Sequence, residues 1–168
     1  MRPLPHPPHS VRIWIAVTCC TTALAVAAWA QGRKAGLYDV TSTMTWQQSP
    51  FPAGMGPAGG PHASQVCVTQ EQIDKYGTVP PQARGECEVT NFAKKDNGYA
   101  ADISCTGRMA TKGTVTASYD GSGHGKTTIH LMGNFQMGTN SKPVEYTIVN
   151  ESTYKGADCG SVQPTAVK

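Results

Sequence analysis

The sequence predicts an all-β domain, an antiparallel meander of about six to seven strands that forms a curled sheet or a small barrel, with one short helix and two disulfides. Three observations predict this class. Short segments alternate apolar and polar residues, as half-buried strands do. Segments rich in Gly and Pro separate them. Four cysteines follow the N-terminal apolar run, and an even number suits a disulfide framework in a small exported domain.

The N-terminal residues 1–30 have the pattern of a secretory signal peptide, cleaved after Ala30. A polar start with Arg2 and Arg12 precedes an apolar run that is too short and too rich in Thr and Cys for a convincing membrane span. Small residues flank position 29, as signal peptidase requires. We expect a periplasmic or secreted protein with no stable membrane insertion after cleavage, and a retained N-terminal anchor is the alternative.

Residues 31–159 form the predicted single β domain, and 160–168 a polar tail. Two of the 14 basic residues, Arg2 and Arg12, lie in the signal peptide, which leaves 12 basic against 11 acidic residues. A net charge near +1 gives no basic field that would attract nucleic acid and no polybasic patch for a membrane surface. We therefore expect no nucleic-acid partner.

The first strand is predicted within 36–46, where polar residues alternate with Tyr38, Val40, Met44 and Trp46. A Gly/Pro-rich loop follows at 48–62, because these residues support neither a helix nor a strand ladder. A short helix is predicted next. Thr69 suits its N-cap, Gln72 completes a capping box three residues later, and Gly77 suits its end.

The chain from Glu86 onward is predicted to be a meander of strands joined by turns. A tight turn at Asp96-Asn97-Gly98 joins its first two strands. A loop is expected at 134–142 before the last strand. The predicted strands lie within residues 86–92, 99–105, 113–120, 126–132 and 143–154.

The four cysteines of the predicted domain leave two pairings open. If the turn is centred near Asp96, Cys87 faces Cys105 on the same side of a hairpin, which places the two sulfurs within bonding reach. A one-residue slip in register would remove that argument. The two pairings are Cys87–Cys105 with Cys67–Cys159, and Cys67–Cys87 with Cys105–Cys159.

The segment from Asp120 to Thr127 ends in Gly125-Lys126-Thr127, as a phosphate-binding loop does. Such a loop has a glycine five residues before this Gly and opens a helix whose N-terminus holds the phosphates. Here Asp120 occupies that position, and an alternating run rich in β-branched residues follows. We interpret the segment as a hairpin loop between two strands and expect no nucleotide site.

The remaining chemistry-bearing residues lack the spacing of a known site. The histidines His62, His124 and His130 lie at no recognised metal-ligand spacing, and no serine stands in a nucleophile elbow between a strand and a helix. His130 and Met132 are expected to point outward from one strand, opposite to Ile129. We predict no catalytic residues, no metal and no cofactor.

An ordered set of short motifs spans nearly all of the predicted domain. They are the opening Gly36-Leu37-Tyr38-Asp39-Val40-Thr41, then Cys67-Val68-Thr69-Gln70-Glu71, Cys87-Glu88-Val89-Thr90-Asn91-Phe92, Cys105-Thr106-Gly107 and Ala157-Asp158-Cys159. This set resembles the bacterial domain-of-unknown-function family 3617. The resemblance departs at Tyr38, Asp39 and Ala157, where the family has Trp, Glu and Gly. It implies an exported location and this architecture, but no mechanism.

The function that we expect is non-catalytic binding. Tyr38, Trp46, Tyr119 and Tyr146 are candidates to line a pocket for a small apolar ligand. The competing interpretation is that these aromatic side chains simply fill the core. An envelope structural or protein-interaction module, which would use an edge strand or the loop 48–62, is the alternative function. A metal-handling protein or an enzyme is the third.

Overall fold

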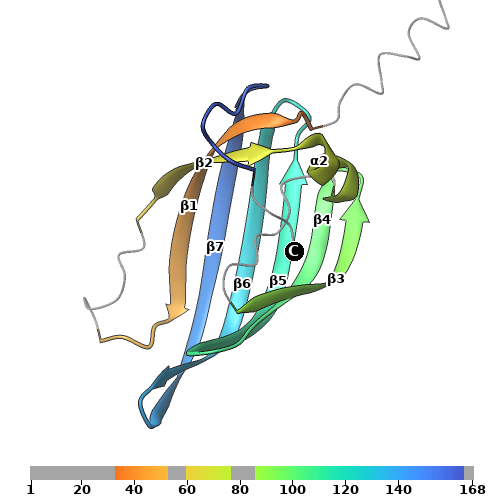
Figure 1. Ribbon diagram of the computed structural model, residues 1–168. Helices are drawn as coiled ribbons and strands as arrows, with labels where there is room; N and C mark the ends of the chain where they lie inside the picture. Colours follow the sequence, from red (N-terminus) through yellow and green to blue (C-terminus); the bar gives the residue numbers. More distant parts are fainter. Residues whose placement is uncertain (1–32, 53–59, 77–85, 165–168) are drawn as a thin grey trace, which may run out of the picture. The chain divides into compact units, whose positions relative to one another are not determined.

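The computed structural model describes residues 33–52, 60–76 and 86–164. Within them, seven strands form one antiparallel sheet in the order β2-β1-β7-β6-β5-β4-β3 (Figure 1). The described residues also contain one short helix, α2 (Gln70–Tyr76), which follows β2 in the chain. The strands are β1 (Gly36–Gln48), β2 (His62–Val68), β3 (Cys87–Lys95), β4 (Gly98–Cys105), β5 (Met109–Tyr119), β6 (His124–Met137) and β7 (Asn140–Gly156).

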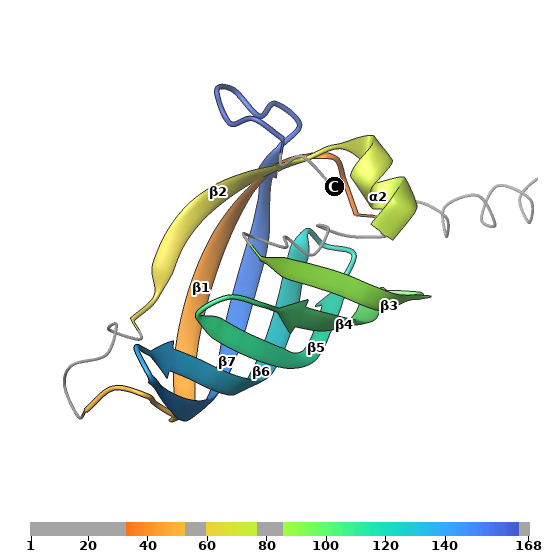
Figure 2. The same ribbon diagram turned by 60° about the horizontal axis from the view of Figure 1, so that its bottom comes forward.

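The predicted all-β meander with one helix is confirmed. A curled sheet or a small barrel was predicted, and the structure has the curled sheet. The edge strands β2 and β3 do not pair with each other, so the sheet is not closed into a barrel. Figure 2 shows the curl, with β1 and β7 running in one direction and β3 to β5 crossing it. One face of the sheet is therefore concave; we call it the inner face, and the other the outer face.

Glycines on β5 and β6 let the backbones of these two strands approach each other closely. A Cβ atom at Gly113 would collide with the carbonyl oxygen of His130, and one at Gly133 with the carbonyl oxygen of Ala110. A strand glycine of this kind allows two backbones to approach where any side chain would keep them apart. The curl of the sheet is therefore specified partly by its backbone.

The core consists of two clusters of buried side chains on the inner face. The main cluster lies over β4 to β7, and its buried members are Tyr99, Ala101, Ile103, Val115, Ala117, Leu131 and Tyr146. The helix cluster lies at the other end of the sheet, where Ile73 of α2 packs with Tyr38 and Val68. Burying such side chains contributes roughly 1.5–3 kcal/mol each relative to leaving them exposed.

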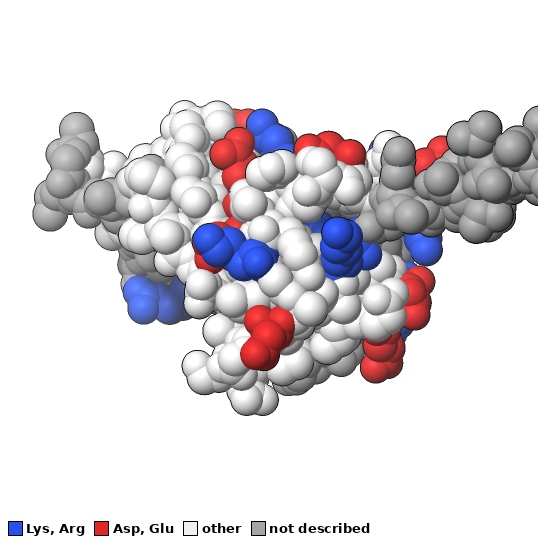
Figure 3. All heavy atoms as spheres, turned by 90° about the horizontal axis from the view of Figure 1, so that it is seen from above, with Lys and Arg blue, Asp and Glu red and all other residues white. Residues whose placement is uncertain are grey.

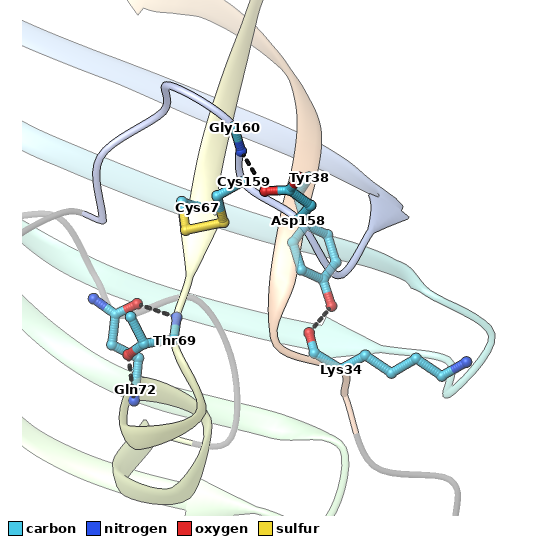
Figure 4. The surroundings of a disulfide bond; sticks show 8 residues. All are labelled: Lys34, Tyr38, Cys67, Thr69, Gln72, Asp158, Cys159 and Gly160. Atoms are coloured by element: carbon cyan, nitrogen blue, oxygen red, sulfur yellow. Dashed lines mark hydrogen bonds between the residues drawn. A yellow bond between two sulfur atoms is a disulfide. The ribbon is translucent and has the colours of Figure 1, made fainter.

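The helix α2 forms where the sequence predicts it. The backbone N–H of Gln72 donates to Thr69 Oγ1 at 3.2 Å, and the backbone N–H of Thr69 donates to Gln72 Oε1 at 2.9 Å, which is the reciprocal capping box (Figure 4). Ile73 packs on the β1–β2 end of the sheet, while Lys94 Nζ of β3 donates to the carbonyl oxygen of Asp74 at 3.5 Å. The helix thus contacts strands from both ends of the unclosed sheet.

Three local features differ from the sequence predictions. Strand β2 forms directly after the Gly/Pro-rich loop, where no strand was predicted. The expected loop at 134–142 is wrong, because β6 and β7 stay paired as far as Met137 and Asn140 and only a two-residue turn joins them. Gly138 in this turn has a φ of +63°, which glycine adopts without strain. A bulge between Thr90 and Ala93 also interrupts β3. The predicted signal peptide and residues 53–59 of the Gly/Pro-rich loop lie outside the described residues.

Candidate functional site

The four cysteines form the disulfides Cys67–Cys159 and Cys87–Cys105. Cys87 lies directly opposite Cys105 in the β3–β4 register, as a turn centred near Asp96 predicts. The Cys67–Cys159 bond ties β2 to the segment that follows β7 (Figure 4), and Pro164 adds a parallel bridge to Cys67. One bond therefore secures the β3 edge of the sheet, and the other secures the β2 edge.

Apolar side chains from β1, β7 and β6 form rows across the inner face. Trp46, Tyr146 and Leu131 lie side by side in one row. The next row on the same face consists of Met44, Ile148, Ile129 and Val115. Residue alternation predicts which side chains of each strand point inward. The pairing of β1 with β7 and of β7 with β6 then places these inward side chains next to one another.

The middle of the inner face is only partly buried. Val115 is fully buried and Leu131 is 3% exposed, but Met44, Ile129 and Ile148 are half-buried. Their strands β1, β6 and β7 lie inside the sheet and not at its edges. Apolar surface therefore stays accessible at a place where a closed, filled barrel would bury it.

The structure places the four predicted pocket aromatics in three separate regions. Trp46 and Tyr146 contact each other, with ring centroids 5.1 Å apart. Tyr38 is fully buried in the helix cluster, where its ring meets that of Tyr154 at 5.3 Å. Tyr119 lies at the end of β5 and donates its hydroxyl to a backbone carbonyl of the β3–β4 turn at 3.2 Å. The four residues therefore do not form one common lining.

Polar groups interrupt the apolar lining of the inner face. The Ser42 hydroxyl donates to Asn150 Oδ1, and Arg33 Nη2 donates to Ser152 Oγ at 3.0 Å. Two further atoms, Trp46 Nε1 and Thr111 Oγ1, are buried and have no hydrogen-bond partner within the described residues. Sequence patterns gave no signal for Arg33, because it precedes the first strand and belongs to no periodic segment.

The β5–β6 hairpin confirms the interpretation of the Gly-Lys-Thr segment. Asp120 Oδ1 accepts hydrogen bonds from the backbone N–H groups of Ser122 at 2.9 Å and His124 at 3.2 Å. Hydrogen bonding by Ser122 is the largest cause that lowers the pKa of Asp120 below its ordinary value. Lys126 and Thr127 belong to β6, so a strand follows the loop instead of a helix.

The outer face carries the exposed histidine that the sequence predicts. His130 Nε2 lies 3.0 Å from Glu145 Oε1, and the two side chains are 38% and 37% exposed. Met132, two residues along, is 54% exposed. Their outward orientation is confirmed. Figure 3, which views the molecule from above Figure 1, shows charged side chains as isolated groups between larger uncharged areas on that side.

Among the described residues, no three His, Cys, Asp or Glu side chains lie close enough together to hold a metal ion. None of the helices in the described residues is long and apolar enough to cross a membrane.

Comparison with known proteins gives one match. The family described as "Protein of unknown function (DUF3617)" matches residues 33–159, most of the chain. The chain therefore belongs to this family, as the resemblance of its motifs indicates. No match was found among curated proteins or among solved structures.

Proposed function

We propose that this member of the DUF3617 family is an exported, non-catalytic domain that binds a small apolar ligand on the inner face of its sheet. The observation that carries the proposal is the half-buried row of Met44, Ile148 and Ile129 in the middle of an unclosed sheet. Covering such apolar surface is favourable by roughly 25 cal/mol per Å² removed from water. A ligand over this row gains that free energy.

The two disulfides support export. Disulfides of this structural kind form and persist in oxidising compartments such as the periplasm. The signal-peptide pattern of residues 1–30 supports the same location.

The composition of the inner face supports binding without catalysis. General acid–base chemistry usually requires a titratable side chain, most often a histidine or a carboxylate, placed at the bound molecule. His130 and Glu145, which contact each other, both lie on the outer face with β-strand backbone between them and the apolar row. The chemistry that the inner rows offer is therefore burial of apolar surface.

The proposal is tested with a neutral apolar fluorophore, N-phenyl-1-naphthylamine, added to the folded, oxidised protein. We expect saturable fluorescence enhancement. Ile148→Gln, which places an amide in the middle of the inner row, should weaken that binding at least severalfold. Val149→Gln is the matched control, because the two residues are neighbours on β7, both half-buried, and face opposite sides. Equal binding by both variants, or no enhancement with the wild type, would exclude the inner face as the ligand site.

A protein-interaction role is the second candidate, and the edge strand β2 favours it. Its residues 62–65 are exposed, and β2 pairs along one side only, apart from the bridge to Pro164. An unpaired strand edge offers backbone donors and acceptors to an added strand of a partner. The test is a Ser64→Pro variant, which removes one backbone N–H donor from this edge strand. Loss of a co-purifying envelope protein in this variant, with ligand binding intact, would support this role in place of the first.

A further inference from the structure

Arg33 is held over the inner face by three strands. Its Nη2 donates to Ser152 Oγ of β7 at 3.0 Å, and its guanidinium carbon lies 4.5 Å from the ring centroid of Tyr38 in β1. On β6, a Cβ atom at Gly125 would lie 3.2 Å from Arg33 Nη1. The absence of a side chain at Gly125 therefore leaves room for the guanidinium. These contacts fix a cation at one end of the inner face.

Charge is segregated between the two faces of the sheet. Every acidic residue in the described strands falls at an outer-face position by register, namely Asp39, Glu88, Asp102, Glu145 and Glu151. By the same register Lys94 and Lys142 are on the inner side, where they donate to backbone carbonyls of Asp74 and Pro50. The strands thus present only cations and uncharged groups on the inner face, which favours a bound anion over a bound cation.

The charge of Arg33 also acts on the main cluster. Tyr99 is 1% exposed, and burial raises the pKa of its phenol far above the ordinary value, because the ionised form is desolvated. The positive charge of Arg33 opposes that rise by favouring the phenolate. Arg33 and Tyr99 of β4 are therefore close enough to interact electrostatically across the inner face.

We propose that the ligand is a long-chain carboxylate, with its head group bound by Arg33 and its aliphatic chain lying over the row of Ile148 and Ile129. This inference rests on the proposed function and specifies its ligand. A guanidinium pairs with a carboxylate through two parallel N–H···O bonds, the geometry that arginine provides best. Ile148 lies four residues from Ser152 along β7, about 13 Å at the rise of a strand. A medium or long aliphatic chain covers that distance.

The test compares dodecanoate with dodecanol as competitors of N-phenyl-1-naphthylamine on the folded, oxidised protein. The two molecules share one chain and differ in the charge of the head group. We expect dodecanoate to bind roughly 10- to 100-fold more tightly, the range that a hydrogen-bonded charged pair contributes. Arg33→Gln should remove this preference by weakening dodecanoate binding, while Arg33→Lys should restore part of it. Lys34→Gln is the matched control, since it removes the neighbouring charge, which lies 5.8 Å from the Tyr154 ring.

The outcomes separate the two proposals. Equal affinities for dodecanoate and dodecanol, or a preference that persists in Arg33→Gln, would overturn the carboxylate inference and leave apolar binding in place. Failure of both competitors to displace the bound fluorophore would also overturn the carboxylate inference, while the fluorophore test with Ile148→Gln decides apolar binding by itself. If Arg33→Gln does not fold, as judged by circular dichroism, the wild-type comparison and Ser152→Ala decide. We expect Ser152→Ala to lower the preference for dodecanoate, because it removes the hydrogen bond that positions the guanidinium.

Discussion

Removing each disulfide separately should destabilise the domain by different amounts. A cross-link lowers the entropy of the unfolded chain, and the effect grows with the logarithm of the length of the closed loop. The sequence separations are 92 residues for Cys67–Cys159 and 18 for Cys87–Cys105. The chain-entropy relation then gives about 4.6 kcal/mol for the longer loop and about 3.2 kcal/mol for the shorter at 25 °C. We therefore expect a difference of about 1.4 kcal/mol, a factor of about ten in the unfolding constant.

The comparison is made by urea denaturation of two double-alanine variants, Cys67→Ala/Cys159→Ala and Cys87→Ala/Cys105→Ala. The free energy of unfolding extrapolated to water is the measured quantity. Each variant loses two sulfur atoms, so the packing losses are matched in composition. The wild type reduced with dithiothreitol provides the third point, since it keeps all four sulfurs and loses both cross-links.

Two results would refute the reasoning. If the Cys87–Cys105 variant loses as much stability as the Cys67–Cys159 variant, loop closure does not determine the contribution of these bonds. If reduction of the wild type costs less than either variant, the alanine substitutions act through lost packing instead.

Two further predictions concern local structure. Gln72→Ala removes one half of the capping box of α2 and leaves the backbone N–H of Thr69 without that acceptor, so the free energy of unfolding should fall by about 0.5–1.5 kcal/mol. Gln70→Ala, at an exposed helix position, is the control and should change the free energy of unfolding little; equal losses would contradict the capping argument. Asp120 should titrate below its ordinary value of 3.8, because hydrogen bonds from Ser122 favour its carboxylate. Its stabilising contribution is therefore present above the unfolded-state pKa and lost as the pH falls through the lowered folded-state value. Carboxyl ¹³C shifts followed by NMR measure this titration, and a midpoint at or above 3.8 would contradict it.

The sequence was sufficient for the strand class and for much of the pairing. Alternation at Tyr38 to Trp46 and at Val144 to Ile148 reflects burial of one sheet face, a strong local constraint, and both strands have that face inward. The turn after Asp96 fixed the register of Cys87 with Cys105 in the same way. These features depend on near neighbours, which a sequence displays directly.

Features that depend on pairing between strands distant in sequence could not be predicted from local sequence patterns. The segment 134–142 was expected to be a loop because most of its residues are polar. Pairing between β6 and β7 nevertheless continues in it as far as Met137 and Asn140, and the rings of Phe135 and Phe51 lie 5.5 Å apart. The bulge at Asn91, which has a φ of +51°, shifts the register of β3. No Gly or Pro at this position predicts the bulge from the sequence. Arg33 acquires its position only when β1, β6 and β7 are side by side.

The candidate site shows the same division. The sequence identified Trp46 and Tyr146 as inward aromatics, and they do contact each other. It could not show that Tyr38 is enclosed by the helix cluster or that Tyr119 is directed to a turn, because these surroundings come from other strands. The half-buried middle row follows from the degree of curl, which no single strand pattern encodes.

The close backbone approach at Gly113 and Gly133 has a consequence for how such a domain can diversify. This close approach needs the absence of a side chain at Gly113 and Gly133, and it does not involve the side chains of Ile129 and Ile148. Substitutions at positions such as Ile129 and Ile148 would then alter the size and polarity of the lining while the curvature persists. If the proposed function holds, relatives with the same sheet curvature would bind different ligands through different inner-face side chains.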